Sequence, residues 1–181
     1  LEGDEYLSSP IDRRPKFHLY QPSIALISGI AWDHINVFPT FENYVEQFEI
    51  FIDKITPGGT LVYFSDDKTL RRIVRNSSNT IKKIPYKTPT YSIENNETLL
   101  DTPDGMMPLE VFGEHNLQNL EGARWICQLM GVNEIDFYEA IASFSGASKR
   151  MEKIFENPDT VVYKDFAHSP SKVDATTQAV K

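Results

Sequence analysis

The chain has 181 residues, of which 40% are hydrophobic and 12% aromatic, a composition that supports a packed core and excludes a disordered chain. The net charge of −8 argues against a nucleic-acid or anionic-membrane surface. The single cysteine excludes an internal disulfide framework and suits a reducing cytoplasm, and no apolar run is long enough to span a membrane.

The two ends of the sequence indicate part of a longer protein. The chain begins at Leu1 rather than at a methionine, and it stops at Lys181 inside a segment with a helical pattern. No signal peptide is visible. We therefore expect that further sequence lies outside these residues.

The first third of the chain alternates strand and helix patterns. Residues 23–29 (SIALISG) form an apolar run of strand length that ends in a loop at 30–39. Apolar side chains recur at helical spacing in 42–55, and a strand pattern at 60–65 and a helical pattern at 67–75 follow. Strand, helix, strand, helix predicts an α/β fold with a mostly parallel sheet and flanking helices.

Residues 81–112 have a different pattern, in which short β-prone segments alternate with turn signals. The strands expected there are 82–86, 90–93, 98–100 and 109–112. Turn residues stand between them at 94–96 and 103–105. This pattern predicts a small antiparallel patch.

The last third predicts two more helices and then the start of a second α/β domain. The helices are expected at 116–130 and 134–144, and 156–159 (ENPD) resembles a connection before a strand at 160–164 and a helix at 171–181. We therefore predict one domain over 1–155 and the beginning of another over 156–181.

Two polar segments in the first domain are candidates for metal chemistry. Glu2, Asp4 and Glu5 place three carboxylates in four residues, and Mg²⁺ is commonly held by one or two carboxylates with water and phosphate; a solvated acidic turn is the alternative. Asp33 and His34 follow the strand at 23–29, at the strand end where parallel sheets carry ligands. His34 capping its own loop is the alternative there.

Further segments are candidates for nucleotide and phosphate contacts. His115, Asn116 and Asn119 share a helical face, and an Asn side chain offers the donor and acceptor that an adenine edge requires; N-capping by Asn116 is the alternative. Arg150 lies in GASKR (146–150) and Asp165 in DFAHSP (165–170), and a cation near a transferring phosphoryl group stabilises its charge. The alternatives are a basic surface turn and a loop held by proline.

Taken in order, these segments resemble the motifs of the Mur ligase family. The resemblance rests on five segments and covers essentially the whole chain: EGDE (2–5), WDH (32–34), GEHNLQN (113–119), GASKR (146–150) and DFAHSP (165–170). It implies an enzyme in which ATP phosphorylates a carboxylate and an amine then attacks the acyl phosphate. ATP and Mg²⁺, with Mn²⁺ as a possible substitute, are the implied cofactors.

The resemblance also implies roles for individual residues. Glu2 matches the metal ligand near the γ-phosphate, and His34 matches the ligand of a second metal. Arg150 matches the arginine at the phosphates or ribose, and these three residues form the implied catalytic set.

Nucleotide contacts are implied at five positions. These are His115, Asn116, Asn119, Arg150 and Asp165, with Asn119 as the adenine reader.

The sequence departs from the family pattern in three places. The family's phosphate-binding Gly-rich loop is absent from these residues, so we expect these residues alone to be inactive. Phe48 stands near the position where several members carry a carbamylated lysine, and Ser169 replaces a common histidine.

Within the family, the link after EGDE favours the peptidoglycan-recycling branch. This link is long, contains DRRPKF (12–17) and precedes Gln21 and Pro22. That branch joins the tripeptide L-alanyl-γ-D-glutamyl-meso-diaminopimelate to UDP-N-acetylmuramate in the cytoplasm. The alternatives are a UDP-N-acetylmuramate–L-alanine ligase and, in another class, a non-catalytic nucleotide-binding domain. The sequence implies neither a nucleic-acid nor a membrane partner, and it is silent on the oligomeric state.

Overall fold

The computed structural model describes residues 3–180. Its contacts divide the chain into two compact units, Leu1–Lys87 and Thr88–Lys181, called here the N-terminal and C-terminal units. Each unit has its own hydrophobic core. None of the helices in the described residues is long and apolar enough to cross a membrane.

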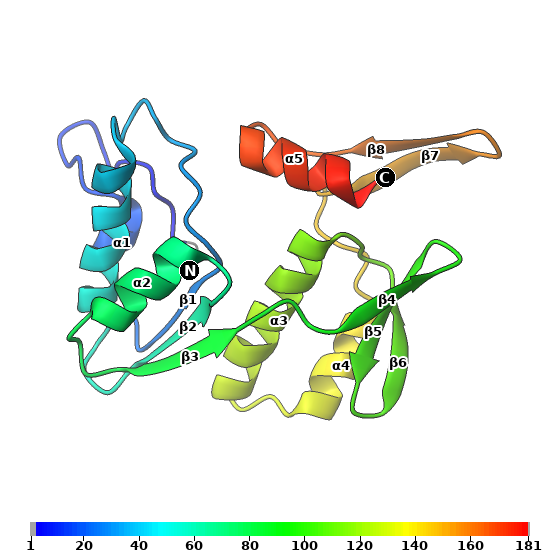
Figure 1. Ribbon diagram of the computed structural model, residues 1–181, viewed down its shortest axis with the longest axis horizontal. Coiled ribbons are helices and arrows are strands. Elements are labelled where there is room, and N and C mark those ends of the chain that lie inside the picture. Colours follow the sequence, from blue (N-terminus) through cyan, green and yellow to red (C-terminus); the bar gives the residue numbers. More distant parts are fainter. Residues whose placement is uncertain (1–2, 181) are drawn as a thin grey trace. The chain divides into compact units, whose positions relative to one another are not determined.

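The N-terminal unit is a three-stranded parallel sheet whose strands are joined through two helices (Figure 1). The strands lie side by side in chain order, and α1 packs against α2. The elements are η1 (Lys16–Leu19), β1 (Ile24–Ile27), α1 (Phe41–Lys54), β2 (Thr60–Phe64), α2 (Lys68–Asn76) and β3 (Lys82–Tyr86).

Side-chain caps start both helices of this unit. The Thr40 hydroxyl accepts a hydrogen bond from the backbone N–H of Asn43 at 3.1 Å, at the start of α1. The Asp67 carboxylate accepts one from Leu70 at 2.8 Å, at the start of α2. Such caps satisfy N–H groups that have no partner within the helix. Each helix then follows directly after the loop at the carboxyl end of a strand.

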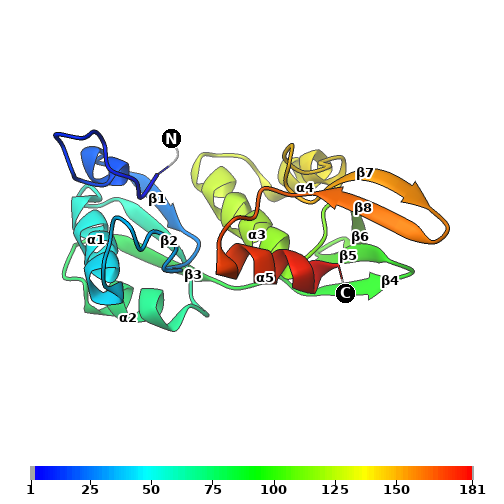
Figure 2. The same cartoon turned by 90° about the horizontal axis from the view of Figure 1, so that it is seen from above.

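The C-terminal unit combines an antiparallel patch, two helices, a hairpin and a last helix. Figures 1 and 2 show the three-stranded patch of β4, β5 and β6 and the separate hairpin of β7 and β8. The elements are β4 (Tyr91–Glu94), β5 (Glu97–Thr102), β6 (Gly105–Leu109), α3 (Glu114–Leu129), α4 (Glu134–Ala142), β7 (Glu152–Asn157), β8 (Thr160–Lys164) and α5 (Pro170–Ala179).

The α/β prediction is confirmed, including the parallel sheet, its helices and the antiparallel patch. The turn expected at 94–96 is present, and both Asn95 and Asn96 have the positive φ of a two-residue hairpin turn, 52° and 65°.

Three strand predictions were wrong in detail. Lys82–Tyr86 is the third parallel strand and not part of the antiparallel patch, because it pairs with β2. The strand predicted at 109–112 ends at Leu109, where its pairing with β5 stops. Residues 156–159 include the turn of a hairpin, and the strand before that turn, Glu152–Asn157, was missed. The domain boundary near residue 156 stays a prediction.

Candidate functional site

The loop after β1 holds His34 in a fixed position. The His34 carbonyl accepts hydrogen bonds from the backbone N–H groups of Val37 at 3.0 Å and Phe38 at 2.9 Å. The indole Nε1 of Trp32 donates to the Phe38 carbonyl at 2.9 Å. His34 is buried, so its imidazole is a defined part of the fold. The backbone carbonyl of His34 therefore caps this loop, as the alternative interpretation requires. The imidazole ring takes no part in these hydrogen bonds.

The imidazole of His34 faces a carboxylate that sequence reasoning did not assign. Its Nε2 lies 3.7 Å from Oε2 of Glu5, and the ring of Tyr6 stacks at a tilt with its centroid 4.4 Å from that of His34. The Tyr44 hydroxyl donates to Oε1 of Glu5 at 3.1 Å. Burial, and then the negative charge of Glu5, raises the pKa of Tyr44, so the phenol stays protonated as the donor. Glu5 is thereby held between His34 and Tyr44.

The other carboxylates of EGDE have different positions. Glu2 lies outside the described residues. Asp4 accepts hydrogen bonds from Lys16 Nζ at 2.6 Å and from the backbone N–H of Tyr6 at 2.9 Å. Burial raises the pKa of Asp4, but these hydrogen bonds and the charge of Lys16 outweigh it and hold the pKa below its usual value. Asp4 therefore fixes the segment that presents Glu5.

The donors around His34 are suited in part to a divalent cation. Within residues 3–180 no group of three or more His, Cys, Asp or Glu side chains is arranged to hold a metal ion. His34 and Glu5 supply two donors, and Mg²⁺ in nucleotide enzymes takes only one or two protein carboxylates, with water and phosphate completing the shell. Glu5 supplies a carboxylate of the kind that Mg²⁺ uses, whereas the imidazole of His34 is a ligand that softer divalent metals prefer.

The predicted nucleotide motif lies at the first turn of α3. Gly113 is the N-cap residue, with φ 87°, so the N-capping role weighed for Asn116 is wrong. The Asn116 side chain instead donates to the Phe112 carbonyl at 2.8 Å. The Asn119 side chain is exposed on the next turn and makes no hydrogen bond within the described residues. The two asparagines therefore differ, one engaged in the fold and the other available to a ligand.

The negative charge of Asp165 acts on the imidazole of His115 although fifty positions separate the two residues. Burial lowers the pKa of His115, and the negative charge of Asp165 opposes this shift. The Asp165 carboxylate accepts hydrogen bonds from the backbone N–H groups of Met151 at 2.7 Å and Ala167 at 2.6 Å. Asp165 thus holds the segment after GASKR beside the start of DFAHSP.

Arg150 joins the same group of residues. Its guanidinium lies over the Phe166 ring, 5.5 Å from the centroid, which is a cation–π contact. His168 is exposed, and its Nδ1 lies 2.8 Å from the Phe166 carbonyl. Ser169, which replaces the family's common histidine, is buried as the N-cap residue of α5.

The structure therefore brings the predicted residues into two groups. One is His34 with Glu5 in the N-terminal unit, and the other joins His115, Arg150 and Asp165 in the C-terminal unit. Glu5 was one of three candidate carboxylates in EGDE, but the specific metal role was given to Glu2, because no spacing in the sequence shows which carboxylate of that motif faces His34.

Comparison with known proteins decides the family. The model of the Mur ligase middle domain matches residues 7–127, a segment that contains both His34 and the GEHNLQN motif. The chain belongs to the Mur ligase middle-domain family. This confirms the resemblance on which the expected site residues rest.

Relatives and a solved structure agree with this family. The chain is 29% identical to a UDP-N-acetylmuramate–L-alanine ligase of Caldicellulosiruptor bescii, over 100% of this chain and 41% of the relative. It is 28% identical to the UDP-N-acetylmuramate–L-alanyl-γ-D-glutamyl-meso-2,6-diaminoheptandioate ligase of Escherichia coli K12, over 100% and 41%. The fold matches MurF of Acinetobacter baumannii with a TM-score of 0.75 at 20% identity, over 90% of this chain and 38% of that one.

The chain thus spans about two fifths of the length of these Mur ligases. The comparison establishes its middle-domain family and its fold.

Proposed function

We propose that the whole protein is an ATP-dependent amide ligase of peptidoglycan recycling, of the murein peptide ligase type. It joins the tripeptide L-alanyl-γ-D-glutamyl-meso-diaminopimelate to UDP-N-acetylmuramate in the cytoplasm. The observation that carries the proposal is the His34–Glu5 pair, held at the carboxyl end of β1 in a Mur ligase middle domain. The carboxyl ends of parallel strands are where α/β folds bind ligands.

The proposed chemistry has two balanced steps. A carboxylate oxygen of the sugar nucleotide attacks the γ-phosphorus of ATP, and ADP leaves with the electrons of the broken P–O bond. The amine nitrogen of the peptide then attacks the acyl carbon, inorganic phosphate leaves, and the amine loses a proton. The protein contributes position and charge neutralisation in both steps.

Individual residues have proposed roles in these steps. His34, with Glu5 beside it, would hold one divalent cation, and Glu2 would hold another near the γ-phosphate. Mg²⁺, or Mn²⁺ in its place, would supply charge neutralisation at the phosphates when bound. His34 lies in the N-terminal unit on a loop fixed by backbone hydrogen bonds, so its ring is positioned before ligands arrive.

The C-terminal unit supplies the proposed nucleotide contacts. Asn119 reads the adenine edge, because its amide is exposed and has no hydrogen-bond partner in the described residues. Arg150 reaches the phosphates or ribose from its place over Phe166. His115 and Asp165 complete the nucleotide-binding group, and Asn116 supports it through Phe112.

L-Alanine is the second candidate for the amine substrate. The relative from Caldicellulosiruptor bescii, at 29% identity, is named for L-alanine, whereas the relative from Escherichia coli, at 28%, is named for the tripeptide. These identities do not separate the two substrates. The long link that contains DRRPKF favours the tripeptide.

The test is a competition between amines with the whole protein, ATP, Mg²⁺ and UDP-N-acetylmuramate. We expect ADP formation with the tripeptide to have a kcat/KM at least about 100-fold above that with L-alanine, a difference of about 2.7 kcal/mol in transition-state binding. Preference for L-alanine would assign the other ligase. ADP formation with neither amine would leave the non-catalytic nucleotide-binding domain.

A further inference from the structure

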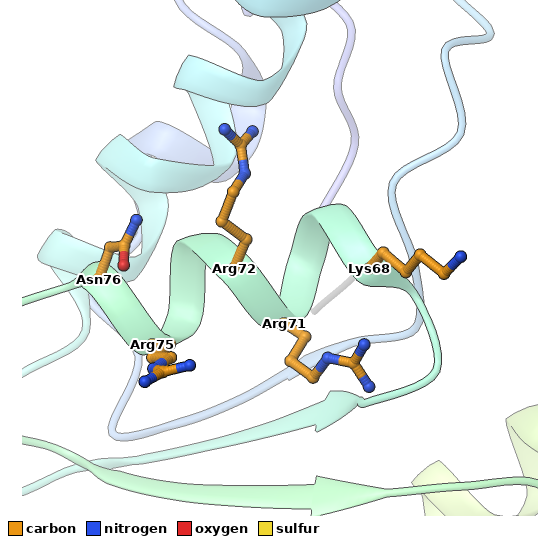
Figure 3. Close-up of a pocket in the computed structure, with 5 residues that line it drawn as sticks. All are labelled: Lys68, Arg71, Arg72, Arg75 and Asn76. Atoms are coloured by element: carbon orange, nitrogen blue, oxygen red, sulfur yellow. The ribbon is translucent and has the colours of Figure 1, made fainter.

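The outer face of α2 carries four cations and no anion. The four residues are spaced three, one and three positions apart, so they share one side of the helix, and all are exposed: Lys68, Arg71, Arg72 and Arg75. The opposite face buries Leu70 and its apolar neighbours in the core. Together with Asn76, the four cations line a shallow hollow, and Figure 3 shows their charged ends spread along the helix and not converging on one point.

This face, called here the basic stripe, has no direct ion-pair partner among residues 3–180. Like charges three or four residues apart on a helix repel one another, so the stripe costs stability in the isolated chain. An external anionic surface would remove that cost.

The same unit presents the complementary feature on α1. Acidic residues recur there at spacings of four, three and four, which places them along one side of the helix: Glu42, Glu46, Glu49 and Asp53. All four are exposed, and none of them forms an ion pair with another described residue. Ile50, with 38% of its surface exposed, lies among them. This acidic stripe has the charge and the helical spacing that the basic stripe requires.

We propose that the two stripes pair between two copies of this chain. In a two-fold arrangement, the basic stripe of each copy lies against the acidic stripe of the other, so that one symmetry operation satisfies both. A nucleic acid fits less well, because the acidic stripe in the same unit and the net charge of −8 repel phosphate. The inference concerns the assembly of the protein and does not depend on its reaction.

The test uses sedimentation velocity of the whole protein in low and high salt. At low salt the protein sediments as a dimer, and salt near 1 M, where the screening length is about 3 Å, weakens the association at least about 10-fold. A protein that is monomeric at low salt and high concentration would overturn the proposal. So would a dimer that salt does not weaken.

Two charge-reversed variants identify the surfaces. One carries Arg71→Glu, Arg72→Glu and Arg75→Glu, and the other carries Glu46→Lys, Glu49→Lys and Asp53→Lys. Each variant alone presents two stripes of one sign, and we expect it to self-associate at least about 10-fold more weakly than the parent.

An equimolar mixture of the two variants is the decisive measurement. Each acidic stripe then meets a basic one, so the mixture should associate as the parent does, which also shows that both variants are folded. A monomeric mixture, or a single variant that dimerises like the parent, contradicts the pairing. Binding of a DNA oligonucleotide or inorganic triphosphate to a monomeric parent, lost on reversal of the basic stripe, would assign that face to another ligand.

Discussion

The Nε2 atom of His34 lies 3.7 Å from Oε2 of Glu5, although 28 residues separate them in the chain. Two elements create this relationship: the loop after β1 presents the imidazole, and α1 presents Tyr44, whose hydroxyl binds the same carboxylate at 3.1 Å. The pair is proposed to hold a cation beside the phosphates of ATP. Kinetics and unfolding measurements on variants of His34 separate the contribution of the pair to turnover from its contribution to folding.

Replacement of His34 by alanine should impair turnover far more than folding. We expect kcat/KM to fall at least about 100-fold, as for the loss of one preorganised group that stabilises charge. The exposed Asn36 in the same loop makes no hydrogen bond or ion pair within the described residues, so Asn36→Ala is the matched control. Steady-state kinetics and urea unfolding are compared for both variants. Unchanged kinetics in His34→Ala would make this histidine a residue of loop structure alone.

The two asparagines of GEHNLQN should give opposite results. Asn119→Ala should weaken nucleotide binding with little change in the free energy of unfolding, because its side chain has no partner in the described fold. Asn116→Ala should cost about 0.5–1.5 kcal/mol of stability, since it loses the hydrogen bond to Phe112. Calorimetric titration of ADP and urea unfolding check both. A stable Asn119→Ala protein with parental ADP affinity would remove Asn119 from the adenine site.

Gly113 is required at the start of α3 for two reasons. Its φ of 87° disfavours any side chain, and a Cβ there would lie 2.7 Å from the Cβ of Ala179. Gly131 has a similar φ of 92° but open space around it. We expect Gly131→Ala to cost about 1 kcal/mol from backbone strain and Gly113→Ala about 2–4 kcal/mol from strain and overlap together. Equal losses in urea unfolding would show that the close approach of α5 is not maintained in solution.

Acid should destabilise the fold through buried His18. Burial lowers its pKa below the ordinary 6.5, while its hydrogen bond to the Gln47 carbonyl, at 2.8 Å, opposes the shift. The imidazole of His18 binds a proton less readily in the folded state than in the unfolded chain. Neutral His18 therefore makes its full contribution to the free energy of unfolding above pH 6.5. That contribution is lost as the pH falls through the folded pKa, with a slope of at most about 1.4 kcal/mol per pH unit.

Urea unfolding at about pH 7.5 and 5.5 tests this dependence. His18→Gln should lose less stability between the two values than the parent, whereas a substitution of the exposed His168 should leave the difference unchanged. Identical losses in the parent and in His18→Gln would contradict the assignment.

Much of the N-terminal unit was predictable, because its elements have regular patterns. The apolar run at β1 and the helical spacing of α1 indicated their structures directly. The strand at 82–86 was predicted, but its parallel pairing was not, because its pattern does not distinguish it from the β-prone segments that follow. Pro85 lacks an N–H group, and the described sheet accommodates it in β3, a terminal strand that pairs only with β2.

The hairpin in the C-terminal unit was harder to predict for a different reason. All six residues of β7 are exposed, so Glu152–Asn157 shows no alternation between buried and exposed positions. At the candidate site, the motifs indicated His34 and Asp165, but not the contacts that define them. The carboxylate that faces His34 and the backbone groups that bind Asp165 depend on how distant segments pack.

The most direct measurement of the central claim follows oxygen from the substrate carboxylate into phosphate. The whole protein is supplied with UDP-N-acetylmuramate whose carboxylate carries ¹⁸O in both positions, together with ATP, Mg²⁺ and the tripeptide, and the inorganic phosphate is analysed by mass spectrometry. Ligation through an acyl phosphate predicts one ¹⁸O atom in every phosphate released and one retained in the new amide. Phosphate free of ¹⁸O would show that water attacks ATP, and the proposed ligase mechanism would be wrong.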